Sequence, residues 1–282
     1  MKSSNPVFAR SAEFNGRGGA TATDPSQWQV DLDGSSTPSP THTEPGSGRM
    51  TLDTVVEKTA MSLGILTVAA GITWVLIGDL NPANTTAGDA YGRAFTFAMG
   101  GAIIGLVLSL VNSFKKVISP ALVIAFAVFE GVFVGAFSKV IAAYVGDVSV
   151  VFQAVVATIV AFAGTLAAYK FFNIQVTDKF RKVVTISVFA FVGATVINLL
   201  LSLTGVVDNG GIRGFNTLGL VVSAVAVVLA VFMLIMDFDM VEKGIAAGLP
   251  ERESWRAAFG LTVTLVWLYI EMLRILAILR GD

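Results

Sequence analysis

Two acidic residues stand in an apolar segment of the chain. Asp237 and Asp239 lie in the sequence FMLIMDFDMV, residues 232–241, and the apolar segment around them is long enough to cross a bilayer. An ionised side chain at membrane depth costs roughly 2.5–3.5 kcal/mol by insertion scales, and it usually faces the protein interior or a water-filled cavity. Such residues commonly have a function, so this pair favours the movement or sensing of cations or protons.

The spacing of the two aspartates gives them different surroundings. On a helix, residues two apart point about 200° away from each other, so the two carboxylates do not form a shared site by themselves. Asp239 has Lys243 four residues later, which predicts an ion pair near the helix end, with a role in transport as the alternative. Asp237 has no basic residue three or four positions away. It therefore needs a partner from another helix, a proton or a cation.

Further ionisable residues within the apolar segments include Glu130, Glu271 and Arg274. Glu130 is in the middle of AFAVFEGVFVGAF, and it is either a structural hydrogen-bonding acid or part of an ion or proton path. Glu271 and Arg274 in YIEMLRIL are three residues apart, a spacing that predicts a pair on one helix face. Such a pair would satisfy its own charges without any role in transport.

The composition indicates an integral membrane protein. Of the 282 residues, 54% are hydrophobic and 14% are charged, whereas a soluble domain has about 25% charged residues. The mean hydropathy is +0.75. The net charge of −1 argues against a nucleic-acid partner, because nucleic acids bind basic surfaces. The partner that this composition predicts is the lipid bilayer.

Seven apolar segments of spanning length follow a polar N-terminal tail. Residues 1–50 are rich in Ser, Thr, Gly and Pro without helical periodicity, so we expect a disordered cytoplasmic tail, either a solvated tether or a docking segment. Residues 51–282 form the second domain, and their pattern predicts an all-α bundle of seven transmembrane helices. The expected spans are residues 53–79, 91–114, 118–141, 149–172, 181–204, 215–242 and 254–279.

The distribution of basic residues predicts the orientation of the bundle. Lys115 and Lys116 follow the second span, and further lysines and arginines lie in the loops after the fourth and sixth spans, whereas the opposite loops are poor in them. By the positive-inside rule, the N-terminus is cytoplasmic and the C-terminus is outside. We interpret Lys115 and Lys116 as topology anchors, with a charge partnership with Asp237 as the alternative.

Small residues recur one helical turn apart in two spans. Gly101 and Gly105 lie in the second span, and Ala127, Gly131 and Gly135 lie in the third. Small residues at this spacing let helix backbones approach closely in lipid, where no hydrophobic drive brings helices together. We expect these positions to mark helix contacts rather than a ligand site.

The residues that many membrane enzymes use are missing from the apolar segments. The chain has no cysteine, and its only histidine is His42 in the polar tail, which argues against a serine–histidine pair or a multi-histidine metal site in the membrane. The last span has no aspartate between Ala257 and Leu279, so a protease with facing aspartates is not supported. We expect no enzymatic activity and no tightly bound cofactor.

Four motifs, in their order along the chain, resemble one family. AFAVFEGVFVG, FAGTLAAYKFF, MDFDMVEKGI and WLYIEMLRILAIL are similar to segments of the Bax inhibitor-motif transmembrane family, in its bacterial branch with a long polar tail. The resemblance covers residues 51–279. It implies a bundle of six helices around the seventh, located in a bacterial plasma membrane. The characterised bacterial member of the family is a pH-sensitive calcium leak, so the resemblance implies calcium as the permeant ion.

The ion-responsive residues of the family are only partly matched. In the family, an aspartate on the sixth helix pairs with one on the seventh, and an arginine of the second helix joins them in one state. The resemblance places Asp237 at the first position and Thr264 at the second, so the carboxylate pair is missing. The arginine is absent from its expected place near Ser113, where Lys115 or Lys116 would substitute. What remains is a weak, transient calcium site at Asp237, with the Thr264 hydroxyl and backbone carbonyls nearby.

Two other functions fit the sequence. Some bacterial relatives modulate a membrane protease and others influence cell-death pathways, which implies a membrane regulatory protein that acts through its tail or cytoplasmic loops. A proton-coupled transporter of small solutes would instead use Glu130 and Asp237 as proton carriers. The species expected at the acidic residues are therefore calcium or protons.

Overall fold

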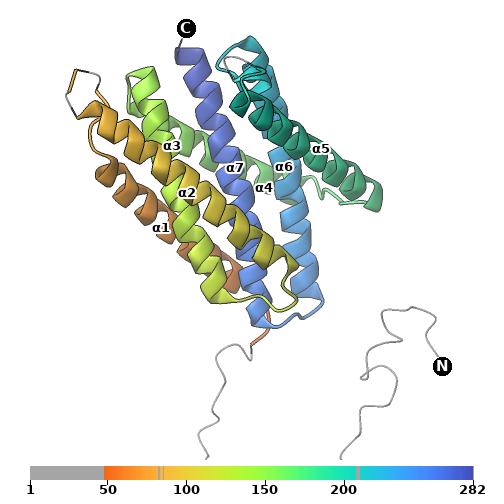
Figure 1. The fold of residues 1–282 in the computed structure, drawn as a ribbon. Helices are drawn as coiled ribbons and strands as arrows, with labels where there is room; N and C mark the ends of the chain where they lie inside the picture. The colour runs from red at the N-terminus through yellow and green to blue at the C-terminus, as the bar shows by residue number, and fades with distance from the viewer. Residues whose placement is uncertain (1–47, 82, 85, 208–209, 282) are drawn as a thin grey trace, which may run out of the picture. The chain divides into compact units, whose positions relative to one another are not determined.

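The described part of the chain contains seven long helices (Figure 1). The computed structural model describes residues 48–81, 83–84, 86–207 and 210–281, so the predicted tail lies almost entirely outside the described residues. All seven helices are long and apolar enough to cross a membrane, which confirms the predicted fold class. Their bounds are α1 (Leu52–Ile77), α2 (Ala87–Phe114), α3 (Pro120–Val145), α4 (Ser149–Phe171), α5 (Asp178–Leu203), α6 (Thr217–Ala246) and α7 (Ser254–Arg280).

Local sequence signals set where several of these helices begin and end. The Thr51 hydroxyl accepts a hydrogen bond from the backbone N–H of Thr54, and the Thr54 side chain completes a capping box at the start of α1. Pro120 begins α3, where its missing N–H costs nothing, and Gly146 ends α3 with a φ of 74° that favours glycine. α6 continues past its predicted end to Ala246 because polar residues can extend a helix beyond the bilayer.

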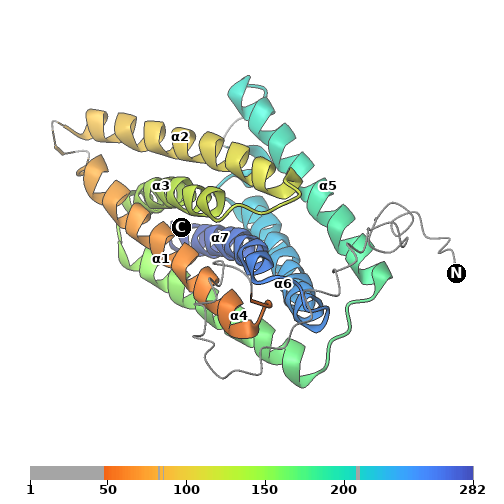
Figure 2. The ribbon, with the colours of Figure 1, turned by 90° about the horizontal axis from the view of Figure 1, so that it is seen from below.

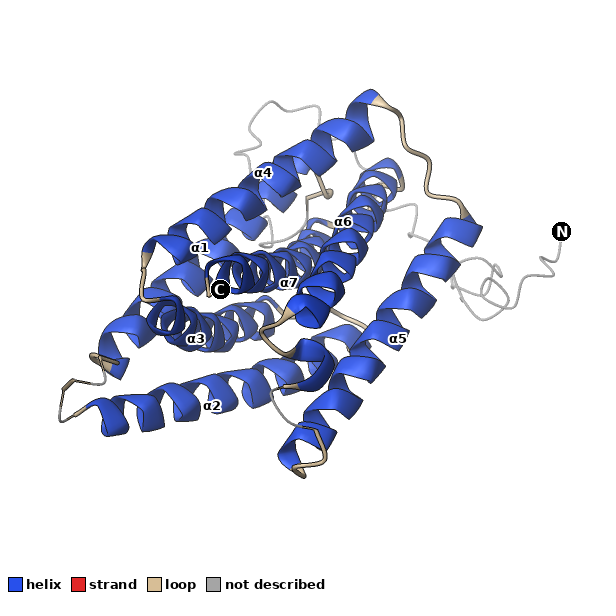
Figure 3. Cartoon of the chain, turned by 90° about the horizontal axis from the view of Figure 1, so that it is seen from above, coloured by secondary structure: helices blue, strands red, loops and turns tan. Residues whose placement is uncertain are grey.

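The seventh helix is the central one. The buried share of the most apolar stretch is 61% for α7, against 17% for α2 and 11% for α5. α1, α3, α4 and α6 pack against α7, and Figure 2 shows α7 enclosed by these helices. α2 packs chiefly on α3, and α5 packs chiefly on α6, so these two helices take outer positions (Figure 3). Residues carried by α7 can therefore contact most of the bundle.

Glycines let α3 approach its neighbours closely. A Cβ atom added to Gly131 would lie 2.3 Å from the carbonyl oxygen of Leu66 in α1, and one added to Gly135 would lie 2.4 Å from that of Ala70. A Cβ atom on Gly101 in α2 would lie 2.7 Å from the backbone nitrogen of Phe133. These distances are shorter than atoms can tolerate, so the small residues predicted from the sequence stand where helix backbones meet.

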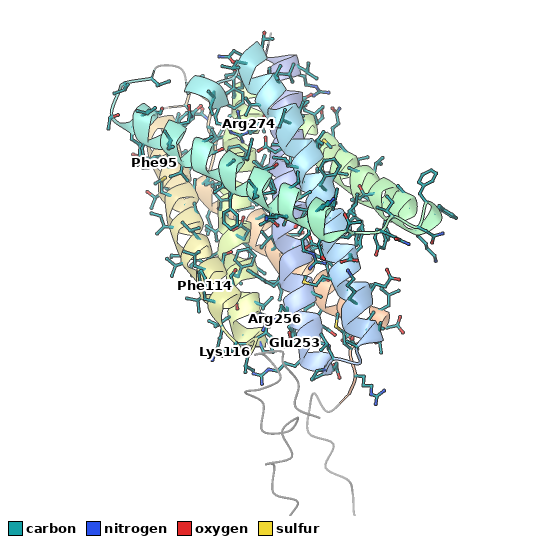
Figure 4. All side chains as sticks on the ribbon, turned by 90° about the vertical axis from the view of Figure 1, so that its right-hand side faces the viewer. Phe95, Phe114, Lys116, Glu253, Arg256 and Arg274 are labelled. Carbon is teal, nitrogen blue, oxygen red and sulfur yellow. The ribbon has the colours of Figure 1, made fainter. Side chains whose placement is uncertain are left out.

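One end of the bundle, called the basic end below, consists of the loops between α2 and α3, between α4 and α5, and between α6 and α7. Figure 4 shows Lys116, Glu253 and Arg256 together at this end and Arg274 toward the other end. Arg256 donates to the carbonyl oxygen of Lys116 at 2.9 Å and pairs with Glu253 at 2.7 Å. The start of α7 is thereby joined to the loop between α2 and α3.

The residues before α1 are held against the loop between α6 and α7. The backbone N–H of Met50 donates to the carbonyl oxygen of Leu249, and that of Glu251 donates to the carbonyl oxygen of Gly48, both at 2.7 Å. The Lys58 ammonium pairs with the Glu251 carboxylate, also at 2.7 Å. The segment before α1 and the start of α1 are therefore bound to the loop between α6 and α7.

The glycine contacts predict opposite effects for two matched substitutions. Gly131→Ala should lower the melting temperature in mild detergent, because the added methyl group meets the α1 backbone and overpacking of this kind costs about 1–3 kcal/mol. Gly100→Ala is the control, since no atom lies within 4 Å of the Cβ position there. Its melting temperature should stay the same or rise slightly. Equal melting temperatures for the two variants would contradict the close contact.

The loop between α3 and α4 predicts a pH-dependent contribution to stability. Ser149 donates hydrogen bonds to the Asp147 carboxylate, and these bonds, with the nearby Arg280 guanidinium, hold the pKa of Asp147 below its ordinary value. A lowered pKa stabilises the folded state above the ordinary value, and this stabilisation is lost as the pH falls through the lowered pKa. Asp147→Asn should therefore lower the melting temperature at pH 7, and the difference from the parent should vanish in strong acid.

Candidate functional site

The carboxyl group of Asp237 is buried between α6 and α7. Asp237 is 6% exposed and lies about 14 Å along the α6 axis from its Ala246 end, at 1.5 Å per residue. The Thr264 hydroxyl on α7 donates a hydrogen bond of 2.7 Å to Asp237 Oδ2. The structure thus brings together the two residues that the sequence analysis placed at one site.

The Thr264 hydroxyl has a choice of two acceptors. Its oxygen lies 2.7 Å from Asp237 Oδ2 and 3.1 Å from the carbonyl oxygen of Gly260, one turn earlier on α7. A hydroxyl carries a single hydrogen, so it can donate to only one of them at a time. Gly260 also lies beside the other carboxylate oxygen, because a Cβ atom added there would be 3.6 Å from Asp237 Oδ1. Three kinds of oxygen ligand are therefore gathered here: a carboxylate, a hydroxyl and a carbonyl.

No basic side chain neutralises Asp237 in the described part of the chain. None of the ion pairs found there, at a limit of 4.0 Å, includes its carboxylate. Lys115 and Lys116 have exposed side chains, and their contacts with Arg256 are made by backbone carbonyl oxygens. The structure therefore does not bring these two lysines to Asp237, and the partner of the carboxyl group is a hydroxyl.

Asp239 has the opposite environment although it is only two residues away. It is also 6% exposed, but its Oδ2 atom accepts from the Arg181 guanidinium on α5 at 2.7 Å and from the Lys243 ammonium at 2.8 Å. The Lys243 contact is the one that the four-residue spacing indicates, whereas Arg181 comes from another helix. Two cations compensate this carboxylate, so it needs neither a proton nor a mobile ion.

Glu271 and Arg274 are not a self-contained pair. Glu271 is 1% exposed and accepts two hydrogen bonds from the Arg213 guanidinium, at 2.7 and 3.1 Å. Arg274 is 3.9 Å from Glu271 and donates instead to the carbonyl oxygen of Arg213, at 2.6 Å, and to Ser223. The pair that the spacing predicts is therefore present, but it belongs to a three-residue cluster in which Arg213 makes the stronger bond to Glu271, because its guanidinium faces the carboxylate with two nitrogens.

Glu130 lies at the contact between α2 and α3. A Cβ atom on Gly105 would be 2.9 Å from Glu130 Oε2, so the glycine makes room for the acid. No hydrogen bond or ion pair of the Glu130 side chain is found among the residues that the structure describes. The side chain is half-buried, and nothing in the structure joins it to Asp237.

The oxygen ligands at Asp237 suit a weakly held cation. Calcium takes six to eight oxygen ligands, and tight sites contain several carboxylates. Among the described residues, no group of three or more His, Cys, Asp or Glu side chains could hold a metal ion. Asp237 supplies a single carboxylate, so a cation would keep most of its water and bind only transiently.

Two arginines that matter for the buried acids were missed by the sequence analysis. Arg181 and Arg213 are each 58 residues away from their carboxylate partners, so no spacing along one helix reveals the pairs. The position of Arg213 could have indicated a structural role, because it lies on the side of the bundle whose loops are otherwise poor in basic residues.

The whole chain was compared with known proteins. The sequence pattern of the family described as Bax inhibitor 1 like matches residues 5–281. No curated protein matches the chain. Because the family match covers nearly the entire sequence and the seven apolar helices agree with it, this integral membrane protein belongs to the Bax inhibitor 1 like family.

Proposed function

We propose that the protein is a cation leak of the bacterial plasma membrane, with calcium as the permeant ion and Asp237 as the responsive group. One observation supports the proposal most strongly: the Asp237 carboxyl group has a hydroxyl partner and, within the part of the chain that the structure describes, no cationic one. An ionised carboxylate there is costly until a cation or a proton compensates it. The other two paired acids, Asp239 and Glu271, already have their cations.

The oxygen ligands suggest how an ion would be held and released. A cation at the Asp237 carboxylate would also meet the Thr264 hydroxyl, whose hydrogen can turn to the Gly260 carbonyl and leave the oxygen lone pairs for the ion. With one carboxylate the site stays weak, which conduction requires, because an ion that binds tightly does not leave. Protonation of Asp237 would remove the attracting charge and restore the hydrogen bond from Thr264 to a neutral acid.

The proposed orientation places the basic end in the cytoplasm. The N-terminus is then cytoplasmic and the C-terminus outside, as the positive-inside rule requires. In this orientation Asp237 lies nearer the cytoplasmic ends of α6 and α7, so the proton concentration of the cytoplasm would set its occupancy. No catalytic step is part of the proposal.

Neutralising Asp237 tests the role of its charge. In proteoliposomes, calcium flux through Asp237→Asn at neutral pH should fall about tenfold or more, the effect of losing roughly 1.4 kcal/mol of cation attraction. The pH dependence between pH 5 and 8 should flatten, because the group that exchanges a proton for the ion is gone. Asp239→Asn is the comparison variant. Provided that its melting temperature shows a folded protein, its flux should change less than that of Asp237→Asn. Equal flux through the parent and Asp237→Asn at every pH would refute the assignment.

Two substitutions of Thr264 test the hydroxyl ligand. Thr264→Val keeps the shape of the side chain but removes its oxygen, so calcium flux should fall by a factor of about 2–13, as the loss of a bond worth roughly 0.5–1.5 kcal/mol implies. Thr264→Ser keeps the hydroxyl and should conduct like the parent. If the valine and serine variants conduct equally, Thr264 is a packing residue and not a ligand.

A second function, regulation of a membrane partner through the tail, is favoured by the contact ahead of α1. The backbone of Gly48 and Met50 is hydrogen-bonded to the loop that joins α6, which carries Asp237, to α7, which carries Thr264. A partner that held the tail would act on that loop through these bonds. The same family supports the idea only by resemblance, since some relatives act on a membrane protease.

Removal of the tail separates the two functions. The deletion should end at residue 44, so that the hydrogen bonds of Gly48 and Met50 remain. If conduction is the function, calcium flux through the shortened protein should equal that of the parent. If regulation is the function, the shortened protein should no longer capture a membrane protein that the parent captures in the producing cell. In that case neither protein should give more calcium flux than empty liposomes.

A further inference from the structure

A long groove lies between α1 and α4, apart from Asp237. Its volume is about 1780 Å³, and its wall on α1 extends from Leu52 to Trp74. At 1.5 Å per residue this is about 33 Å, close to the hydrocarbon thickness of a bilayer, which is about 30 Å. The groove is therefore about as long as the hydrocarbon core of a bilayer is thick.

The central helix forms the floor of the groove. Leu261, Leu265, Val266 and Tyr269 of α7 line it, although α7 is the most enclosed helix of the bundle. α1 and α4 both pack on α7 but scarcely contact each other, so the floor is reached between them. In Figure 3, α1 and α4 lie on the same side of α7, away from α5. Lipid chains beside the protein can reach α7 here.

The walls of the groove are apolar and open to the surroundings. Val56 on α1 is 57% exposed, and Ile159 on α4 is 59% exposed. The threonine hydroxyls of the middle part are largely satisfied within their own helices, since Thr67 donates to the carbonyl oxygen of Leu63 and Thr158 to that of Ala154. Over most of its length the groove thus offers hydrocarbon, and the Thr59 hydroxyl on α1 is the exception, since it has no hydrogen-bond partner among the described residues.

Charged residues line the groove only at the basic end. They are Lys170, Asp239, Glu242 and Lys243, whereas the other end is lined by residues such as Gly71, Trp74 and Val151. A transmembrane helix of a partner protein is polar at both ends, and the groove does not match that pattern. A molecule with one polar end and an apolar body fits this distribution.

The charge at this end favours an anionic head group. Asp239 is already shared by Arg181 and Lys243, and Glu242 accepts a hydrogen bond of 2.6 Å from the Tyr169 hydroxyl. Lys170 has no carboxylate within 4.0 Å among the described residues. The groove itself is lined by two cations and two carboxylates, but Arg181, from outside the groove, shares in compensating Asp239, and Lys170 is left to bind a negative group.

We propose that this groove binds an anionic phospholipid from the leaflet at the basic end. Its phosphate lies at Lys170, with Lys243 beside it, and its acyl chains lie along α1 and α4 above the floor of α7. One leaflet supplies chains of about 15 Å, half of the hydrocarbon thickness. The lipid therefore occupies the half of the groove between Leu52 and Leu63, next to the charged residues.

Lipid retention and thermal stability test the proposal. The purified full-length protein should retain one phosphatidylglycerol molecule after detergent washing, as counted by native mass spectrometry, and added phosphatidylglycerol should raise its melting temperature to a plateau. Lys170→Gln should weaken the apparent affinity about tenfold, as the loss of one charge-assisted contact implies. Lys116→Gln is the matched control, an exposed lysine at the same end that does not line the groove.

A second pair of variants tests the acyl part independently of charge. Ala60→Trp fills the groove from α1 and should abolish phosphatidylglycerol retention, whereas Val68→Trp, an exposed position of the same helix outside the groove, should leave it intact. Equal stabilisation by phosphatidylcholine and phosphatidylglycerol would overturn the proposal in favour of ordinary surrounding lipid. An equal effect of inorganic phosphate would overturn it in favour of a site for free anions.

Discussion

An ionised side chain within a bilayer is stable only beside a group that compensates its charge. In this bundle some of the compensating groups come from other elements, so these ion pairs connect those elements. Asp239 fastens α6 to α5 through Arg181, and Glu271 fastens α7 to the segment before α6 through Arg213. Each of these acids is satisfied by a guanidinium, which suits a carboxylate well. Asp237 lies among them, and in the described ranges of the chain its partner is the Thr264 hydroxyl alone. The contrast separates the acids that hold the structure together from Asp237, which is free to exchange an ion or a proton. Glu130 on α3 also has no cationic partner among the described residues, but nothing joins it to Asp237.

The central position of α7 connects the features described above. This helix supplies the Thr264 hydroxyl, the Glu271 carboxylate and the floor of the groove between α1 and α4. A small rotation of α7 would change its contact with Asp237 and the width of the groove at the same time. Close-packed interfaces tend to move between discrete arrangements, so events at one of these places would be felt at the other.

The sequence was sufficient to predict the helices. It was not sufficient to predict which side chains pair between them. Apolar length predicted all seven spans, glycine spacing predicted the contacts of Gly131 and Gly135, and the four-residue rule predicted Lys243 beside Asp239. Arg181 and Arg213 were missed because pairing between helices depends on how each helix is rotated, which a single sequence does not encode in its spacing. The position of Thr264 opposite Asp237 came from family resemblance and not from periodicity.

The fastening ahead of α1 has a consequence for how the chain is assembled. The hydroxyls of Thr54 and Ser254 are 2.8 Å apart although 200 residues separate them. The ion pair of Lys58 likewise cannot form until Glu251 has been synthesised. A ribosome completes the first helix long before the last hairpin emerges. Until then, α1 is held chiefly by α3, through the backbone contacts at Gly131 and Gly135. Insertion of the final hairpin is therefore the step that closes the bundle, and a chain that stops earlier leaves Lys58 in the membrane without its counter-ion.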